Sequence, residues 1–317
     1  MVESASAGIH HVTAMAADPQ RNIDFYAGIL GLRLVKRTVN FDDPETYHFY
    51  YGDQLGRPGT IMTFFAKAGS RPGMRGAGQV AVTAFSIASE SSAYWRHRFE
   101  SAGVVVESST RFDEAVLGVR DPDGLKLELV AASAATAHEP WTQGPVPPEH
   151  AVRGLHSVSL ASRASDSTAG ILTDVLAARL LAEADGRLRF RFVDDGPGTL
   201  VDVVPTAAEP RGMSGAGTVH HVAWRAASDQ EHGALREQVA CRGLDVTEVL
   251  DRTYFRSIYF REPGGILFEI ATDAPGFSVD EPTDGLGHDL KLPGWLEADR
   301  ERIEACLSPI RFPGTET

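Results

Sequence analysis

The chain contains little cysteine. Of its 317 residues only Cys241 and Cys306 are cysteines, and neither lies at the spacing of a Cys/His metal site. A disulfide framework and a thiolate zinc site are therefore not supported, and we expect two inert thiols.

Basic residues are fewer than acidic residues, with 30 Lys and Arg against 43 Asp and Glu and a net charge of -13. Because this negative field would repel nucleic acids and anionic membranes, a small molecule is the expected partner.

Long apolar runs are missing as well. No stretch approaches the roughly 20 apolar residues that a membrane helix needs. Met1–Ala7 lacks a basic region followed by an apolar one, so we expect a cytoplasmic protein without membrane contact. With 43% hydrophobic and 23% charged residues, the chain is long enough for two domains with cores of their own. The composition is compatible with a homo-oligomer as well as with a monomer.

What the chain does contain is four copies of one small unit, in which a strand and a helix are followed by three more strands. In the first copy, Asp18-Pro19 supplies a side-chain cap and a first helical proline, and Gly31 ends the helix. The expected strands of units one and two are 9–14, 32–39, 47–51, 60–65, 79–87, 104–107, 115–120 and 125–130. The second helix is expected over about 92–102, and Asp121-Pro122-Asp123-Gly124 predicts a turn between the last two strands.

Units three and four repeat units one and two. Val175–Leu180 echoes Ile29–Leu34 at an offset of 146 residues, which is 175 minus 29. Residues 212–217 repeat the Gly-Met-x-Gly-Ala-Gly pattern of 73–78. Since neither glycine run has the G-x-x-x-x-G-K spacing of a phosphate loop, we interpret both as turns between units. The sequence therefore predicts an N-terminal domain (8–131), a linker (132–153), a C-terminal domain (154–275) and a tail (276–317) with one helix near 295–306.

Two pairs of adjacent histidines stand at matching positions, His10-His11 in unit one and His220-His221 in unit four. Each pair lies among apolar and β-branched residues typical of a buried strand. Strand alternation sends neighbouring side chains to opposite faces, so one histidine of each pair is expected to face a cavity. A single pair would more often be a core histidine bonded to the backbone. The recurrence favours a functional site.

Comparison of the four units selects a metal site. Units one and four together supply two histidines and Glu269, whose strand is apolar enough to bury the carboxylate. A buried carboxylate needs a metal ion or a basic partner. Units two and three supply Val82, Ser157 and Glu128, a set that cannot hold a metal. We therefore expect unit one to pack with unit four around a metal, leaving units two and three as a vacant counterpart.

The last strands of units one and three, around Met62-Thr63 and Val201-Asp202, offer no carboxylate that can be matched to Glu269. Two histidines and one carboxylate leave coordination positions open, which is typical of non-haem Fe(II) oxygenases. Zinc more often has three or four nitrogen and sulfur ligands, although two histidines and a glutamate can also hold it.

These features resemble the vicinal oxygen chelate superfamily of glyoxalases, bleomycin-resistance proteins and extradiol dioxygenases. Within it, the chain is similar to ring-cleaving dioxygenases of the hydroquinone 1,2-dioxygenase type. The resemblance runs from Gly8 to about Phe277. It rests on residues 8–13, 35–42, 56–60, the second histidine pair and 268–277.

The resemblance implies an α+β fold in which four βαβββ modules form two incomplete barrels. It implies that His11, His221 and Glu269 are iron ligands, and so decides which histidine of each pair is the ligand. It further implies that five residues surround the substrate: His10, Thr13, His220, Arg252 and Tyr259.

The implied activity is Fe(II)-dependent cleavage of a para-diol aromatic ring with dioxygen as co-substrate. Zinc or nickel could replace iron in a purified sample. Three alternatives stay open at this point: an extradiol dioxygenase for catechols, a glyoxalase-like lyase or isomerase, and a non-enzymatic protein that binds a drug or quinone.

Overall fold

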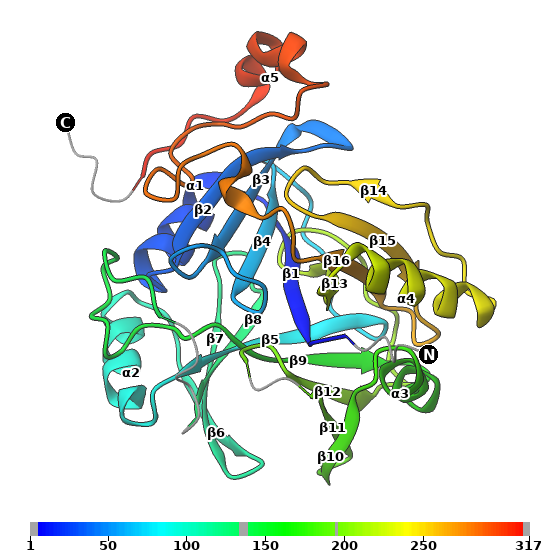
Figure 1. Ribbon diagram of the computed structural model, residues 1–317. Helices are drawn as coiled ribbons and strands as arrows, with labels where there is room; N and C mark the ends of the chain where they lie inside the picture. Colours follow the sequence, from blue (N-terminus) through cyan, green and yellow to red (C-terminus); the bar gives the residue numbers. More distant parts are fainter. Residues whose placement is uncertain (1–5, 133–138, 194–195, 313–317) are drawn as a thin grey trace.

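The computed structural model describes residues 6–132, 139–193 and 196–312, so residues 133–138 of the predicted linker lie outside it. The strands form two curled, eight-stranded sheets (Figure 1). In spatial order the first sheet contains β14 (Leu250–Asp251), β15 (Arg256–Arg261), β16 (Leu267–Thr272), β13 (Val219–Ala226), β1 (Ile9–Ala16), β4 (Ile61–Ala66), β3 (Asp43–Gly52) and β2 (Arg33–Asn40). The second contains β10 (Arg179–Ala184), β11 (Arg187–Arg191), β12 (Leu200–Pro205), β9 (Leu155–Ser162), β5 (Gln79–Ile87), β8 (Lys126–Ala131), β7 (Glu114–Arg120) and β6 (Glu107–Arg111).

Each sheet combines one unit from each half of the chain. β1 of unit one pairs antiparallel with β13 of unit four, and β5 pairs in the same way with β9. The first and last strands of each unit are parallel neighbours, such as β1 with β4 and β13 with β16. The prediction of four βαβββ modules in two incomplete barrels, with unit one beside unit four, is confirmed. The division into domains 8–131 and 154–275 stays a prediction, since each sheet draws on both ranges.

Short helices flank the sheets. They are α1 (Pro19–Ile23), the π-helix η1 (Asp24–Ile29), η2 (Ser89–Ser91), α2 (Ser92–Ser101), α3 (Ser165–Asp174), α4 (Asp229–Cys241), η3 (Phe277–Val279), η4 (Glu297–Asp299) and α5 (Arg300–Cys306). The Asp18 carboxylate caps α1 as predicted, because it accepts hydrogen bonds from the backbone N–H groups of Gln20 and Arg21. The helix of unit one then widens into π geometry instead of continuing as an α-helix, which places both Phe25 and Tyr26 in the core.

One predicted strand was misplaced. The strand expected at 104–107 is β6, which covers Glu107–Arg111. Val104 and Val106 pack against the core before the strand begins. Their apolar character therefore reflects the loop that follows α2 rather than a buried strand.

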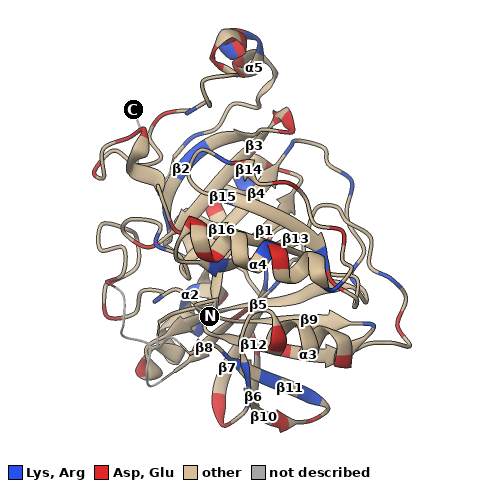
Figure 2. Ribbon diagram, turned by 45° about the vertical axis from the view of Figure 1, so that its right-hand side comes forward, with Lys and Arg blue, Asp and Glu red and all other residues tan. Residues whose placement is uncertain are grey.

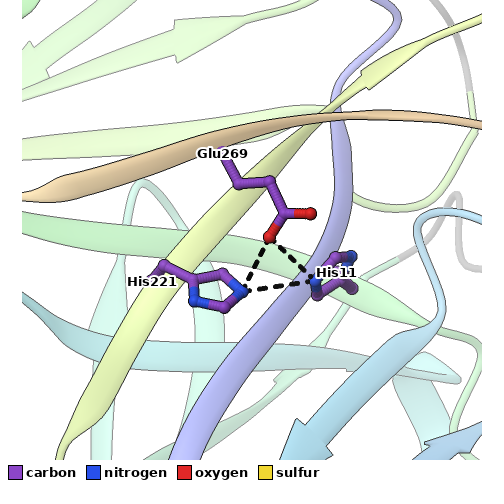
Figure 3. Close-up of side chains that lie close together, drawn as sticks. All are labelled: His11, His221 and Glu269. Carbon is purple, nitrogen blue, oxygen red and sulfur yellow. Dashed lines mark hydrogen bonds and ion pairs between the residues drawn. The ribbon is translucent and has the colours of Figure 1, made fainter. Parts of the chain in front are cut away.

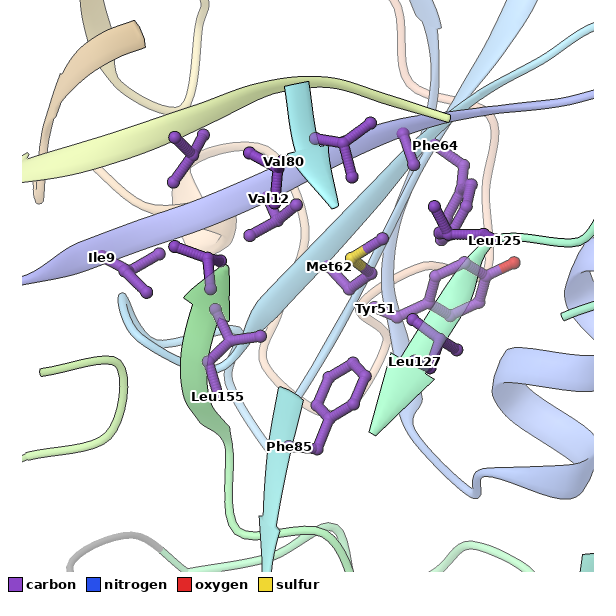
Figure 4. Close-up of a cluster of buried hydrophobic side chains, with 14 of the residues drawn as sticks. Ile9, Val12, Tyr51, Met62, Phe64, Val80, Phe85, Leu125, Leu127 and Leu155 are labelled. Carbon is purple, nitrogen blue, oxygen red and sulfur yellow. The ribbon is translucent and has the colours of Figure 1, made fainter. Parts of the chain in front are cut away.

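The main core lies between the backs of the two sheets. Val12, Met62 and Phe64 of the first sheet meet Val80, Phe85 and Leu127 of the second (Figure 4). Because side chains alternate along a strand, the residues between these positions turn toward the interior of their own barrel. Packing between the two sheets thus fixes which face of β1 and of β4 points into the interior of the barrel that the first sheet forms. This barrel is called the first barrel below.

The C-terminal tail runs beside the edge strand β2 of unit one. Lys36 of β2 is fully buried, and its amine binds the carboxylates of Asp280 and Glu281. The tail then reaches α5 at the top of Figure 1, where Ile303 is buried against the core and the Tyr47 hydroxyl of β3 donates a hydrogen bond to the Ser308 carbonyl oxygen. This helix begins at Arg300, after the single 3-10 turn η4, rather than near 295 as expected.

Candidate metal centre

Three neighbouring central strands of the first barrel bring His11, His221 and Glu269 together. β1 carries His11, β13 carries His221 and β16 carries Glu269. The His221 Nε2 lies 2.8 Å from Glu269 Oε2, and the His11 Nε2 lies 3.4 Å from that oxygen and 3.4 Å from His221 Nε2 (Figure 3). All three residues are buried. Within the described residues they are the one group of three or more His, Cys, Asp and Glu side chains close enough to hold a metal ion.

Two β-bulges shape the histidine pairs. Where β1 pairs with β13, the register shifts at His10 and again at His220, so each is the extra residue of a bulge. Strict alternation therefore fails here, because a bulge re-aims the side chains beside it. The Nδ1 atoms of His10 and His11 are 2.9 Å apart, and those of His220 and His221 are 2.8 Å apart. The expectation that the two members of each pair face opposite ways was thus wrong at this site.

These contacts orient the two inner histidines. Burial lowers the pKa of His10 well below its usual range and lowers the pKa of His220 to about 3, so both rings are neutral. A neutral ring can accept a hydrogen bond at Nδ1. If His11 and His221 donate from Nδ1, their Nε2 lone pairs point at each other and at Glu269. Outer partners of this kind fix the ring orientation of metal-binding histidines.

Glu269 remains ionised despite complete burial. Desolvation raises the pKa of its carboxyl, but the neighbouring His11 and His221 outweigh that effect and hold the pKa well below its ordinary value. The Ser257 hydroxyl donates a hydrogen bond to Oε1. The other oxygen, Oε2, has no regular hydrogen-bond donor among the described residues. A buried carboxylate oxygen without a regular donor is costly unless a cation balances its charge, so this oxygen is a favourable ligand for a metal ion.

The spacing of the three donor atoms fits a metal ion. Two ligand atoms, each about 2.1 Å from one ion and about 90° to 110° apart at it, would be about 3.0 to 3.4 Å from each other. Two of the observed separations are 3.4 Å and lie in this range, and the third, 2.8 Å between His221 Nε2 and Glu269 Oε2, is slightly shorter. Two nitrogen donors and one carboxylate oxygen suit iron, and also suit zinc or nickel.

The other predicted residues lie beside this cluster. Tyr259 is on β15, and its ring centroid is 5.7 Å from that of His221. Arg252 donates from Nε to the Tyr259 hydroxyl at 3.3 Å and forms an ion pair with Asp42 at 3.0 Å. Burial raises the pKa of Tyr259, so its phenol keeps its proton. Thr13 of β1 lies directly opposite His221 in the strand pairing.

The sequence reading missed several residues at the site. Ser257 bonds Glu269, and Phe255 packs its ring 5.2 Å from the rings of both His10 and His11. Phe255 and His10 also line a cavity of about 180 Å³. His48 and Tyr50 of β3 were missed because their relevance depends on how β3 pairs with β4. The sequence did contain one signal for them, because His48 and Tyr50 place polar groups at alternate positions of a strand that is otherwise aromatic.

The second barrel has no comparable cluster among its described residues, and arginines neutralise its acidic side chains. Arg111 binds Glu128 through two hydrogen bonds of 2.6 and 2.8 Å. Arg187 and Arg189 both bind Asp202, and β11, which carries them, is largely blue in Figure 2. Pairing of Ser159 with Asp202, and of Ala223 with Glu269, shows that Asp202 is the matched carboxylate of unit three. The sequence-based expectation that unit three has no carboxylate matching Glu269 was therefore wrong, because the match depends on the strand register.

No helix within the described ranges has the length and apolar character needed to span a membrane.

A family model, the Glyoxalase/Bleomycin resistance protein/Dioxygenase superfamily, matches residues 8–129 and 154–270. The chain is 46% identical over 303 residues to MhqO of Bacillus subtilis, named as a candidate ring-cleaving dioxygenase, with 96% of each chain covered. It is 32% identical over 305 residues to the chlorohydroquinone/hydroquinone 1,2-dioxygenase of Sphingobium indicum, covering 93% of this chain and 94% of that one.

Solved structures agree with the fold. A candidate dioxygenase of Bacillus subtilis superposes with a TM-score of 0.93 at 45% identity and covers 97% of this chain and 98% of its own. Glyoxalase I of Zea mays superposes with a TM-score of 0.61 at 16% identity, over 84% of this chain and 92% of its own, and so supports the fold alone.

Proposed function

The chain belongs to the Glyoxalase/Bleomycin resistance protein/Dioxygenase superfamily, and we propose that it is an Fe(II)-dependent dioxygenase that cleaves the ring of hydroquinone-type substrates. The observation that carries this proposal is the convergence of His11, His221 and Glu269 through three donor atoms no more than 3.4 Å apart. Bound Fe(II) would bring a phenolate oxygen and dioxygen together and allow electron density to pass from the ring to dioxygen. The Sphingobium indicum relative, named for hydroquinone and chlorohydroquinone, supports a para-diol substrate.

The residues of the chain divide into two groups in this proposal. With the Nδ1 hydrogens on the ligand histidines, His10 and His220 would accept hydrogen bonds from them and hold their Nε2 atoms toward the ion. Arg252 and Tyr259 lie at the edge of the same cluster. The guanidinium stabilises negative charge that develops on the ring oxygens, and the Tyr259 hydroxyl holds a proton that it can donate to them.

The site itself bears on the alternative functions. A lyase or isomerase of this fold usually fills the site with another carboxylate or histidine, whereas Thr63 stands in unit one where Glu269 stands in unit four. A protein that only sequesters a phenol or quinone has no need of three inward-facing ligands. A catechol dioxygenase would use the same ligand set, so the identity of the diol must be decided by assay.

The deciding experiment is anaerobic reconstitution with Fe(II), followed by oxygen-uptake measurements on substituted hydroquinones and catechols. We expect stoichiometric uptake with hydroquinones and a ring-opened semialdehyde acid as product. Uptake with catechols alone would exclude the para-diol substrate. Absence of uptake with both classes, together with tight binding of the same phenols without iron, would instead favour a binding protein.

A further inference from the structure

A chain of four hydrogen-bonded side chains lines the unit-one wall of the metal-bearing barrel. The Tyr50 hydroxyl is 3.0 Å from His48 Nδ1, and His48 Nε2 is 2.9 Å from the Thr63 hydroxyl. The Thr63 hydroxyl is in turn 2.8 Å from that of Thr13. Tyr50, Thr63 and Thr13 are buried, and His48 is half-buried.

Thr13, the last of these four hydrogen-bonded side chains, lies beside the ligand cluster. Thr13 is two residues beyond His11 on β1, with no register shift between them, so the two side chains share a face. Thr13 also lies directly opposite His221 on β13. Residues opposed in this way have side chains in contact distance. The Thr13 hydroxyl is therefore next to two of the three proposed ligands.

The strand register shows that these hydrogen-bonded side chains of unit one match Glu269 and its neighbours in unit four, with Thr63 at the position of Glu269. Tyr50 pairs with Thr63 as Tyr259 pairs with Glu269. Two residues earlier on each strand, His48 bonds Thr63 and Ser257 bonds Glu269. One half of the barrel thus presents a negatively charged oxygen to the centre, and the other half presents a neutral hydroxyl.

The direction of the hydrogen bonds follows from Tyr50. Among the described residues, the Tyr50 hydroxyl has no partner other than His48 Nδ1. If that nitrogen were the donor, the phenolic hydrogen would be buried without an acceptor, which is costly. Tyr50 is therefore the donor, so His48 carries its hydrogen on Nε2 and donates it to Thr63. Thr63 then donates to Thr13, and the Thr13 hydrogen is left without an acceptor in the described part of the chain.

We propose that Tyr50, His48 and Thr63 are positioning residues that fix the Thr13 hydroxyl as a hydrogen-bond donor to a phenolic oxygen bound at the His11, His221 and Glu269 cluster. The proposal rests on the proposed function in one respect, which is the nature of the oxygen that Thr13 binds. The direction of the hydrogen bonds is a property of the protein alone. The two parts can therefore be tested separately.

The first test is NMR spectroscopy of the full-length protein with ¹⁵N-labelled histidine, loaded with diamagnetic Zn(II). Among the 11 histidines, the His48 signals are assigned as those lost in His48→Gln. We expect a hydrogen on Nε2 and a hydrogen-bonded, unprotonated Nδ1. Tyr50→Phe should move the Nδ1 signal toward that of a free ring nitrogen, whereas Tyr51→Phe, which removes the bond from the neighbouring Tyr51 to Asn22, should not. A hydrogen on Nδ1, or no shift in Tyr50→Phe, would overturn the proposal.

The second test is anaerobic calorimetry of hydroquinone binding to the same Zn(II)-loaded protein. Thr63→Val removes the donor to Thr13 at nearly constant volume, and Thr63→Ser retains a hydroxyl. We expect about tenfold weaker binding in the valine variant and recovery in the serine variant, with Zn(II) content unchanged in both. Equal affinity in the valine variant would overturn the proposal. If the unaltered protein binds no hydroquinone, the proposed function fails, and the His48 hydrogen position still decides the direction of the chain.

Discussion

Glu269→Gln should remove most of the thermal stabilisation that Fe(II) gives the protein. In the unaltered chain, anaerobic Fe(II) at about one hundred times its dissociation constant would stabilise the folded state by about 2.7 kcal/mol. For a chain of this length the melting temperature changes by about 2 °C per kcal/mol, so the expected shift is about 5 °C. Glutamine keeps the size of the side chain but removes its charge, and with it the anionic member of the three converging donors.

The residual shift in the variant can be worked out. Changing a residue that only supports a ligand weakens metal binding by about 10- to 100-fold, so loss of the carboxylate should weaken it at least about 100-fold. At the same Fe(II) concentration the remaining stabilisation is about 0.4 kcal/mol, or about 1 °C. Anaerobic calorimetry with and without Fe(II), and iron content after gel filtration, measure both quantities.

Glu128→Gln is the matched control, because Glu128 pairs with β5 as Glu269 pairs with β13. It breaks the two-bond contact with Arg111 and should lower the metal-free stability by about 2 kcal/mol. The 5 °C shift on adding Fe(II) should nevertheless persist. A full shift in Glu269→Gln, or its loss in Glu128→Gln, would refute the assignment of the metal to the first barrel.

Two further predictions concern charge. Desolvation raises the pKa of Glu114, but His156 and Arg189 outweigh it and lower that pKa to about 2. After allowance for its partial exposure, the carboxylate therefore contributes about 2 kcal/mol above pH 4.5, and this contribution is lost as the pH falls through about 2. The unfolding free energies of Glu114→Gln and the unaltered protein should still differ at about pH 3 and converge only near pH 2, and a constant difference would contradict this. In oxygen-uptake assays, Arg252→Met should lower kcat about 100-fold with iron retained, whereas exposed Arg256→Met should change neither.

The repeat could be recognised from the sequence because its signals are local. Glycine turns, the Asp18-Pro19 cap and apolar alternation define each unit without reference to any other. The identities of His11, His221 and Glu269 also followed from comparing units, although choosing the inner histidine of each pair depended on family resemblance. The fold was therefore predictable to the level of which unit meets which.

The details of the site depend on pairing between strands that are far apart in sequence. The bulges at His10 and His220 form only when β1 meets β13, about 200 residues later. His48 becomes part of the site through its bond to Thr63. Asp202 likewise could be matched to Glu269 only through the register of β12 with β9. No local pattern carries this information, since a shift of one residue would reverse every face.

Both barrels contain buried carboxylates whose negative charge must be balanced, and the two barrels balance it in different ways. In the second barrel, buried Glu128 and Asp202 are balanced by arginines that belong to the chain. In the first, buried Glu269 has two histidines whose outer neighbours are neutral, and no arginine contacts it among the described residues. Its charge is therefore best balanced by a removable cation. An arginine would occupy the space around the carboxylate permanently, whereas an ion held by three protein ligands would have coordination positions left for other molecules. Thr63, which stands in unit one where Glu269 stands in unit four, adds no fourth ligand.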